Sequence, residues 1–310
     1  MAGDVGESYI AAMESSDASV GRATTLIVIS AVSFGSISVL TVLTTGTGLP
    51  LLTVMAWRYV LGALLLAPFA KPLASRAVRK RQIIQLLLIG GFGQALITYL
   101  SLYSLRYIAV GPLAFLFYTY PAWVAAIAAL RGTERLTLTR IVALLLALIG
   151  VTVMVGAPVE RLNPVGVALA LGSALLYSVY LPALEYVQEG IPAMPATFLL
   201  ILGAAATFVV AGVVAGEAFV PRGTAVWANI GLLAVVSTVV AFSALIKGLS
   251  VLGPVRTAII ATVEPFFTAV LGLLVLGNQL GIATIAGGVF IALAIVVIEW
   301  SSTRRVAATA

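Results

Sequence analysis

A glutamate and a proline stand side by side inside an apolar segment near the end of the chain, residues 255–276. Glu264 lies nine residues into this segment, or roughly 14 Å at 1.5 Å per residue, which is close to the middle of a bilayer. A carboxylate is costly in hydrocarbon, so it should face protein or water. Pro265 has no N–H and frees the carbonyl one turn earlier, near Ala261. Carboxylate and carbonyl together can hold an ammonium group; the alternative is a structural carboxylate bonded to hydroxyls or to an arginine.

Arg58 is a second charged residue within an apolar segment, residues 50–70. Its guanidinium can bind a substrate carboxylate through two parallel hydrogen bonds. Two other interpretations stay open, namely an ion pair, for example with Glu264, and a side chain that reaches toward the outer face. The neighbouring Trp57 is a substrate-binding candidate with it.

Aromatic side chains recur at helical spacing within the apolar segments. Tyr99 and Tyr103 share one helix face, and Tyr118 and Tyr177 lie deep in their segments. A tyrosine hydroxyl inside a membrane needs a hydrogen-bond partner, which a polar cavity supplies. Core packing accounts for most such residues, but several can line a pocket for an apolar or aromatic substrate. The aromatic candidates are Phe34, Trp57, Tyr99, Tyr103, Tyr118, Tyr177 and Phe267.

The residue types that the sequence lacks exclude several classes of protein. It contains no cysteine and no histidine, and both aspartates, Asp4 and Asp17, precede the first apolar segment. Metal-, thiol- and aspartate-dependent catalysis in the membrane is therefore excluded, and we expect no enzyme, no cofactor and no metal site. The net charge of +6 does not indicate nucleic-acid binding, because the basic residues lie in short segments between apolar runs.

The composition requires membrane-spanning helices to position these residues. Of 310 residues, 62% are hydrophobic and 9% are charged, whereas a soluble domain is about one-quarter charged. Runs of about 20 apolar residues cross a bilayer as helices. The sequence predicts ten, at residues 23–43, 50–70, 81–105, 109–130, 139–156, 163–187, 194–215, 224–249, 255–276 and 280–300.

The segments outside these spans predict the orientation. Residues 1–22 are polar and acidic, which indicates a disordered cytoplasmic tail rather than a signal peptide, and residues 301–310 form a second tail. Lys and Arg are concentrated in the connections on the side of the N-terminus. Positive charge favours the cytoplasmic side, so we expect both termini there, as an even number of spans requires.

The two halves of the chain repeat each other. When residues 23–156 are aligned with residues 163–300, Pro121 falls on Pro265. Each half has an odd number of spans, so the two enter the membrane in opposite directions, an arrangement typical of secondary transporters. We therefore expect an all-α integral membrane protein, with ten transmembrane helices arranged as two inverted five-helix repeats around a central cavity.

The chain resembles the ten-span bacterial exporters of the drug/metabolite transporter superfamily, which are built from two EamA-type repeats. The resemblance covers residues 23–300 and rests on the two halves, the mid-span arginine, and two prolines that are each followed by a polar turn residue. In this family the turn reads Gly-x-Glu-x-Leu. Gly132-Thr133-Glu134-Arg135-Leu136 keeps the acid, whereas Gly277-Asn278-Gln279-Leu280 replaces it with Asn278. Within the family, the chain is most similar to the YddG-type exporters of aromatic amino acids.

The resemblance implies a multi-pass exporter in a bacterial inner membrane, which moves amino acids or similar metabolites out of the cytoplasm through a central cavity. Amino acids with aromatic or other apolar side chains are the expected substrates. Other metabolites or drugs, and a passive uniporter or channel, are the alternatives. The expected partners are the small-molecule substrate and the lipid bilayer, with no nucleic acid, and we expect a monomer or weak oligomer.

Pro121 and Pro265 are expected to act as hinges. Kinks at matching positions of two spans can open a central site to one side at a time. Tyr120 stands where the second repeat has Glu264. The prolines therefore belong to the shared scaffold, and the glutamate belongs to the chemistry of this particular carrier.

Overall fold

The computed structural model describes residues 2–74, 78–108, 110–134, 136–155, 163–277 and 281–308, and these contain helices and no strands. Within these residues, seven helical segments are long and apolar enough to cross a membrane. Three shorter apolar helices, Leu138–Met154, Glu264–Val275 and Ile282–Ile298, accompany them. The prediction of a multi-span, all-helical membrane protein is confirmed.

The elements follow the expected order of two halves. The first half contains α1 (Ala2–Thr45), α2 (Leu51–Leu66), η1 (Ala67–Ala74), α3 (Lys80–Leu88), η2 (Ile89–Gln94), α4 (Ala95–Ser104), α5 (Val110–Phe117), α6 (Tyr120–Leu130) and α7 (Leu138–Val155). The second half contains α8 (Pro164–Gln188), α9 (Ala193–Val214), α10 (Thr224–Ala234), η3 (Val235–Val240), α11 (Ala241–Ala261), α12 (Glu264–Leu276) and α13 (Ile282–Ala308). Within α11, Gly253 has φ 73° and ψ 170°, and this corner separates the eighth span from the ninth.

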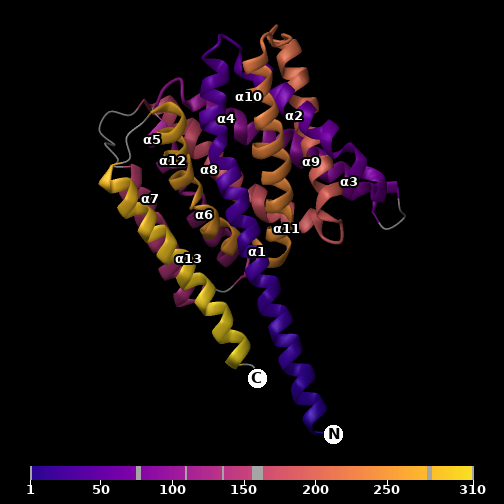
Figure 1. The fold of residues 1–310 in the computed structure, drawn as a ribbon, viewed down its shortest axis with the longest axis vertical. Coiled ribbons are helices and arrows are strands. Elements are labelled where there is room, and N and C mark those ends of the chain that lie inside the picture. Colours follow the sequence, from indigo (N-terminus) through magenta and orange to yellow (C-terminus); the bar gives the residue numbers. More distant parts are fainter. Residues whose placement is uncertain are drawn as a thin grey trace.

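The first and last helices are longer than the sequence predicted. α1 begins at Ala2 and α13 ends at Ala308. Helix therefore continues into residues 2–22, where we expected a disordered tail, and into residues 301–308, which we expected to form a second cytoplasmic tail. Extending an existing helix adds one hydrogen bond per ordered residue and avoids the cost of nucleation, an effect that the polar composition of a tail does not reveal. Both termini lie at the same end of the molecule (Figure 1).

The two halves pack against each other in matching pairs. The second span, α2, packs on the seventh, α9, and the fifth, α7, packs on the tenth, α13. Figure 1 shows α7 and α13 side by side at one edge of the molecule. The first span, α1, packs along α11, which forms the eighth span. The equivalent pair in the repeat also packs together, namely α8 of the sixth span and α4 of the third. Each half therefore buries its helices mainly against the other half.

The irregular parts of the helices also match between the halves. A turn at Tyr118–Thr119 divides the fourth span into α5 and α6. A turn at Thr262–Val263 likewise divides the ninth span into the end of α11 and α12. Pro121 and Pro265 occupy the first turns of α6 and α12. The third and eighth spans each contain one π-helical segment, η2 and η3. Discontinuous helices at equivalent positions are where secondary transporters place their binding sites.

Candidate functional site

A cavity of about 390 Å³ lies where the two helix breaks face each other. The spans that line it are the first, third and fourth of one half and the sixth, eighth and ninth of the other, so each half supplies three equivalent helices. The fifth and tenth spans each add one residue. Principal lining residues are Phe34 of α1, Gln94 of η2, Tyr118 and Tyr120 at the first break, Tyr177 of α8, Phe242 of α11, and Glu264 and Pro265 of α12.

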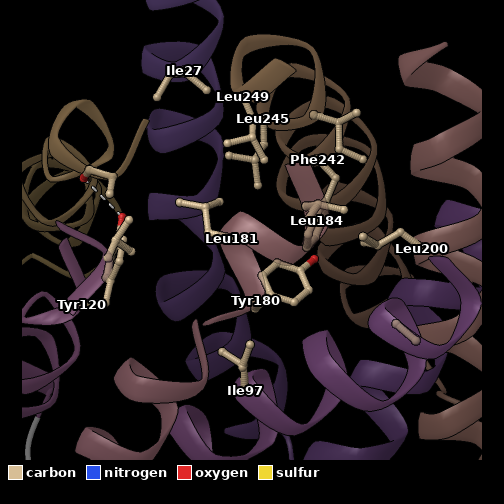
Figure 2. Packing of buried hydrophobic residues seen from close by; sticks show 14 of the residues in the cluster. Ile27, Ile97, Tyr120, Tyr180, Leu181, Leu184, Leu200, Phe242, Leu245 and Leu249 are labelled. Atoms are coloured by element: carbon tan, nitrogen blue, oxygen red, sulfur yellow. Dashed lines mark hydrogen bonds between the residues drawn. The ribbon is translucent and has the colours of Figure 1, made fainter. Parts of the chain in front are cut away.

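The cavity extends toward the end of the molecule opposite the termini. Lining residues Val42 and Met154 lie in the last turns of α1 and α7 at that end. Toward the end that carries the termini, Ile27, Leu184 and Leu249 have no exposed surface and belong to one apolar cluster (Figure 2). Apolar packing therefore closes one end, while the cavity approaches the other.

Glu264 is the carboxylate of this cavity. It is the first residue of α12, where the partial positive charge of the helix end favours an anion. The hydroxyl of Tyr118, which lies in the break of the fourth span, is close to its carboxyl group in the cavity lining. Among the described side chains no ion pair joins Glu264 to an arginine. The carboxylate thus lies beside a neutral hydroxyl and faces the cavity.

Tyr120, the counterpart of Glu264 in the first half, makes the reciprocal contact. Its hydroxyl donates a hydrogen bond to the carbonyl oxygen of Ala258, 3.4 Å away (Figure 2). This carbonyl is available because the N–H of Thr262, its usual helical partner, bonds to Ile259. Glu264, which precedes Pro265, therefore lies beside the break of the fourth span. Tyr120, which precedes Pro121, contacts the helix just before the break of the ninth span.

Aromatic rings form much of the cavity wall. Tyr120 and Tyr177 meet edge to face at 4.7 Å between ring centroids, and Phe117 lies 5.6 Å from Tyr177. Phe34 and Phe242 meet edge to face at 4.9 Å. Of the residues predicted from the sequence, Phe34, Tyr118, Tyr177, Glu264 and Pro265 line the cavity.

Gln94 is a lining residue that our reading of the sequence missed. Its side chain is 8% exposed, and its amide nitrogen donates to the hydroxyl of Thr98 at 3.0 Å. Its Oε1 atom has no hydrogen-bond partner among the described residues. The signal in the sequence was a single polar amide, Gln94, directly after Gly90, Gly91 and Gly93 of an apolar run.

Arg58 lies outside the cavity lining and binds η3 instead. Its side chain is 1% exposed, its Nε donates to the Thr238 hydroxyl at 2.7 Å, and its Nη2 donates to the Ser237 carbonyl at 2.8 Å. The guanidinium carbon lies 4.9 Å from the ring centroid of Tyr59. Within the described residues it is paired with no carboxylate. The structure thus gives Arg58 a bracing contact between α2 and the π-helical segment.

The remaining aromatic candidates lie away from the cavity lining. The indole N–H of Trp57 donates to the Phe219 carbonyl at 3.0 Å, and Trp57 lines a separate cavity of about 280 Å³ beside α9. Tyr99 and Tyr103 stack at 5.2 Å, and Phe267 packs edge to face on Phe266 at 5.6 Å. The structure therefore does not bring these four together with Glu264.

The turn after the fourth span holds an ion pair. Glu134 and Arg140 lie 2.7 Å apart, which joins this turn to the first residues of α7. The equivalent turn of the second half, with Asn278, lies outside the described residues. Pro121 lies in the first turn of α6, directly after the break, and is not among the lining residues.

Comparisons with known proteins agree with this architecture. The EamA-like transporter family matches the sequence twice, over residues 21–156 and residues 164–300. No curated protein matches the chain. A solved structure, described only as the crystal structure of a protein, matches with a TM-score of 0.76 and 18% identity over 91% of this chain and 98% of the other. At that identity the likeness establishes the fold alone.

Proposed function

Because the chain belongs to the EamA-like transporter family, we propose that it exports small amine-bearing metabolites from the cytoplasm by alternating access. Amino acids with aromatic or other apolar side chains are the first substrates to test. The observation that carries the proposal is the cavity at the paired helix breaks, where one carboxylate stands among aromatic rings. The proposed location is a bacterial inner membrane, with the chain acting as a monomer or weak oligomer.

The cavity suits a molecule of amino-acid size. Its volume of about 390 Å³ is within the range of small-molecule sites. In the proposed complex the ammonium group faces Glu264, and the apolar part of the substrate packs on Phe34, Phe117 and Tyr177. Charge-assisted hydrogen bonds contribute roughly twice as much as neutral ones, so Glu264 supplies the main polar contact.

Alternating access follows from the symmetry between the halves. In the state seen here, the contact between Tyr120 and Ala258 belongs to the closed side, along with the packed side chains of Ile27, Leu184 and Leu249. We propose that the halves exchange conformations during transport, so that this packing opens while the opposite end closes. The closed apolar end argues against a continuous pore, because a channel needs an uninterrupted polar path.

Counterflow into proteoliposomes tests this function. Vesicles preloaded with unlabelled phenylalanine should accumulate labelled phenylalanine transiently, with a rate that saturates. Glu264→Gln should lower this rate by roughly tenfold to a hundredfold, because a neutral amide keeps an acceptor oxygen but loses the negative charge that attracts an ammonium group. Glu217→Gln is the matched control, since Glu217 lines the separate cavity beside α9, and it should transport normally.

Two results would contradict the proposal. Flux that rises linearly with concentration and shows no counterflow would indicate a channel. A Glu264→Gln protein that transports at the full rate would remove the carboxylate from the mechanism.

A further inference from the structure

We propose that the cavity selects for amines that carry no carboxylate, so that an aromatic or apolar amine binds more tightly than the corresponding amino acid. This inference rests on the proposed function, because it names the substrate class of the same site. It follows from the polar groups that the cavity presents to a ligand.

The described lining contains one anion and no cation. Glu264 is the only charged residue among the described lining residues, and no Lys or Arg accompanies it. Arg58, the arginine that the sequence offered for a substrate carboxylate, is engaged elsewhere. It donates to Thr238 and Ser237. Arg106, another arginine outside the lining, lies over the ring of Tyr103, 4.6 Å from its centroid. A zwitterion in this cavity would pair its ammonium group and leave its carboxylate without a countercharge.

Two hydroxyl groups at the breaks already have their proton engaged. Tyr120 donates to the backbone carbonyl oxygen of Ala258, and Thr268 donates to the backbone carbonyl oxygen of Glu264 at 3.1 Å. A hydroxyl has one proton to donate, so these two groups offer a ligand mainly acceptor sites. A ligand carboxylate needs donors, whereas an ammonium group needs acceptors.

Gln94 supplies an independent observation in the same direction. Its Oε1 atom is buried without a partner among the described residues, and Gln94 lines the cavity. A buried acceptor left unpaired is destabilising, and an ammonium donor from a ligand would satisfy it. Glu264 and Gln94 thus provide two acceptors from opposite halves of the molecule.

The aromatic wall favours a cation as well. Faces of Tyr and Phe rings attract ammonium groups, and the attraction grows when water is excluded. Phe34, Phe117, Tyr177 and Phe242 lie around the same space as Glu264. An acid, an amide oxygen and aromatic rings together form an environment for an organic cation with an apolar body.

Three compounds that share one phenyl ring and a short chain test the inference. Phenethylamine has the amine alone, phenylalanine has the amine and the carboxylate, and 3-phenylpropanoate has the carboxylate alone. Equilibrium binding to the purified full chain in detergent should give at least a tenfold lower Kd for phenethylamine than for phenylalanine. Binding of 3-phenylpropanoate should be at least a hundredfold weaker than that of phenethylamine. Equal or tighter binding of phenylalanine, or competition by 3-phenylpropanoate at similar concentrations, would overturn the inference.

A pair of glutamine variants locates the effect. Gln94→Met should weaken phenethylamine binding about fivefold or more and affect 3-phenylpropanoate little. Gln188→Met is the matched control, because Gln188 also has a buried, unpartnered Oε1 but packs on α11, where its amide donates to Ile246. It should leave phenethylamine binding unchanged. If the two variants weaken binding equally while both remain folded, Gln94 does not contact the amine and the inference loses its second acceptor.

Binding and transport are measured separately, so the two proposals fail separately. The predicted ligand order without counterflow would support the amine site and contradict transport. Counterflow with a preference for phenylalanine over phenethylamine would support transport and contradict the amine site.

Discussion

Two buried tyrosines differ in whether their hydroxyl group has a partner. Tyr120 donates to the Ala258 carbonyl, whereas the hydroxyl of Tyr180 has no partner among the described residues. Tyr120→Phe should therefore lower the free energy of unfolding by up to about 1 kcal/mol, because it removes a hydrogen bond and leaves a carbonyl unpaired. Tyr180→Phe should leave it unchanged or raise it by about 1 kcal/mol, because it removes a buried unpaired group. Unfolding in mixed micelles, followed by circular dichroism, measures both; equal losses would contradict the assignment.

A substitution at Arg58 can test whether this residue stabilises the fold or binds the substrate. Its guanidinium forms two hydrogen bonds to η3 in fixed directions, a geometry that a lysine ammonium does not reproduce. Arg58→Lys should lower the free energy of unfolding by about 1–3 kcal/mol. The protein that remains folded should bind phenylalanine with unchanged Kd. A normal unfolding free energy together with a large loss of binding would place Arg58 at the substrate instead.

The presence of Glu264 in a cavity rather than on a lipid-facing surface was predictable from the sequence, but the partners of Arg58 were not. A carboxylate inside an apolar run is expected to face protein or water. The hydrogen-bond acceptors of Arg58 are the Thr238 hydroxyl and the Ser237 carbonyl, which lie 180 and 179 residues away in the sequence. No local sequence pattern marks these partners. The same holds for Tyr120, whose partner is a backbone atom in the other half. Contacts of this kind depend on how the two halves dock.

Among the elements, the helix breaks were predictable and the π-helical segments were not. Aligned prolines indicated matching irregularities in the fourth and ninth spans, and both are divided there. The segments η2 and η3 occupy equivalent spans but have unrelated sequences, Ile-Gly-Gly-Phe-Gly-Gln and Val-Val-Ser-Thr-Val-Val. The backbone of η2 lies close to Leu200 of α9, since a Cβ on Gly90 would overlap that residue. In η3, by contrast, Arg58 donates a hydrogen bond to the Ser237 carbonyl. Different local causes give the same shape, so sequence alignment does not detect it.

The prolines are predicted to affect movement more than folding. Pro121 and Pro265 lie in first turns of helices, where a backbone N–H has no helical partner. Replacing both by alanine should therefore change the free energy of unfolding by less than about 1 kcal/mol. It removes the steric block to a continuous helix, so the counterflow rate should fall at least tenfold, about 1.4 kcal/mol in the activation barrier.

A third proline provides the control for this double variant. Pro164 also lies in a first turn, at the start of α8, but it is at an ordinary helix end capped by Asn163. Pro164→Ala should leave both stability and counterflow nearly unchanged. If the double variant transports as fast as the unmodified chain, the breaks do not act as hinges.

At the scale of the whole molecule, the structure combines a closed apolar end with a cavity that approaches the opposite end. This asymmetry arises although the halves have matching elements, so the two halves adopt different conformations around the same centre. The sequence repeat predicted the paired elements, but two similar halves can adopt either of two exchanged arrangements, so sequence could not predict which end is closed.

Single engineered cysteines can measure that asymmetry, since the chain contains no cysteine of its own. Ser38 lines the cavity, whereas Leu184 is fully buried at the closed end. A membrane-impermeant maleimide added outside intact cells should therefore label Ser38→Cys at least tenfold faster than Leu184→Cys, because only a hydrated thiol reacts. Leu145→Cys, on a side chain 52% exposed on α7, is the control for a lipid-facing thiol and should react slowly. In inside-out vesicles, transported substrate should accelerate labelling of Leu184→Cys, because the exchanged state opens that end. Labelling of Leu184→Cys from both sides at one constant rate would instead indicate a permanent pore.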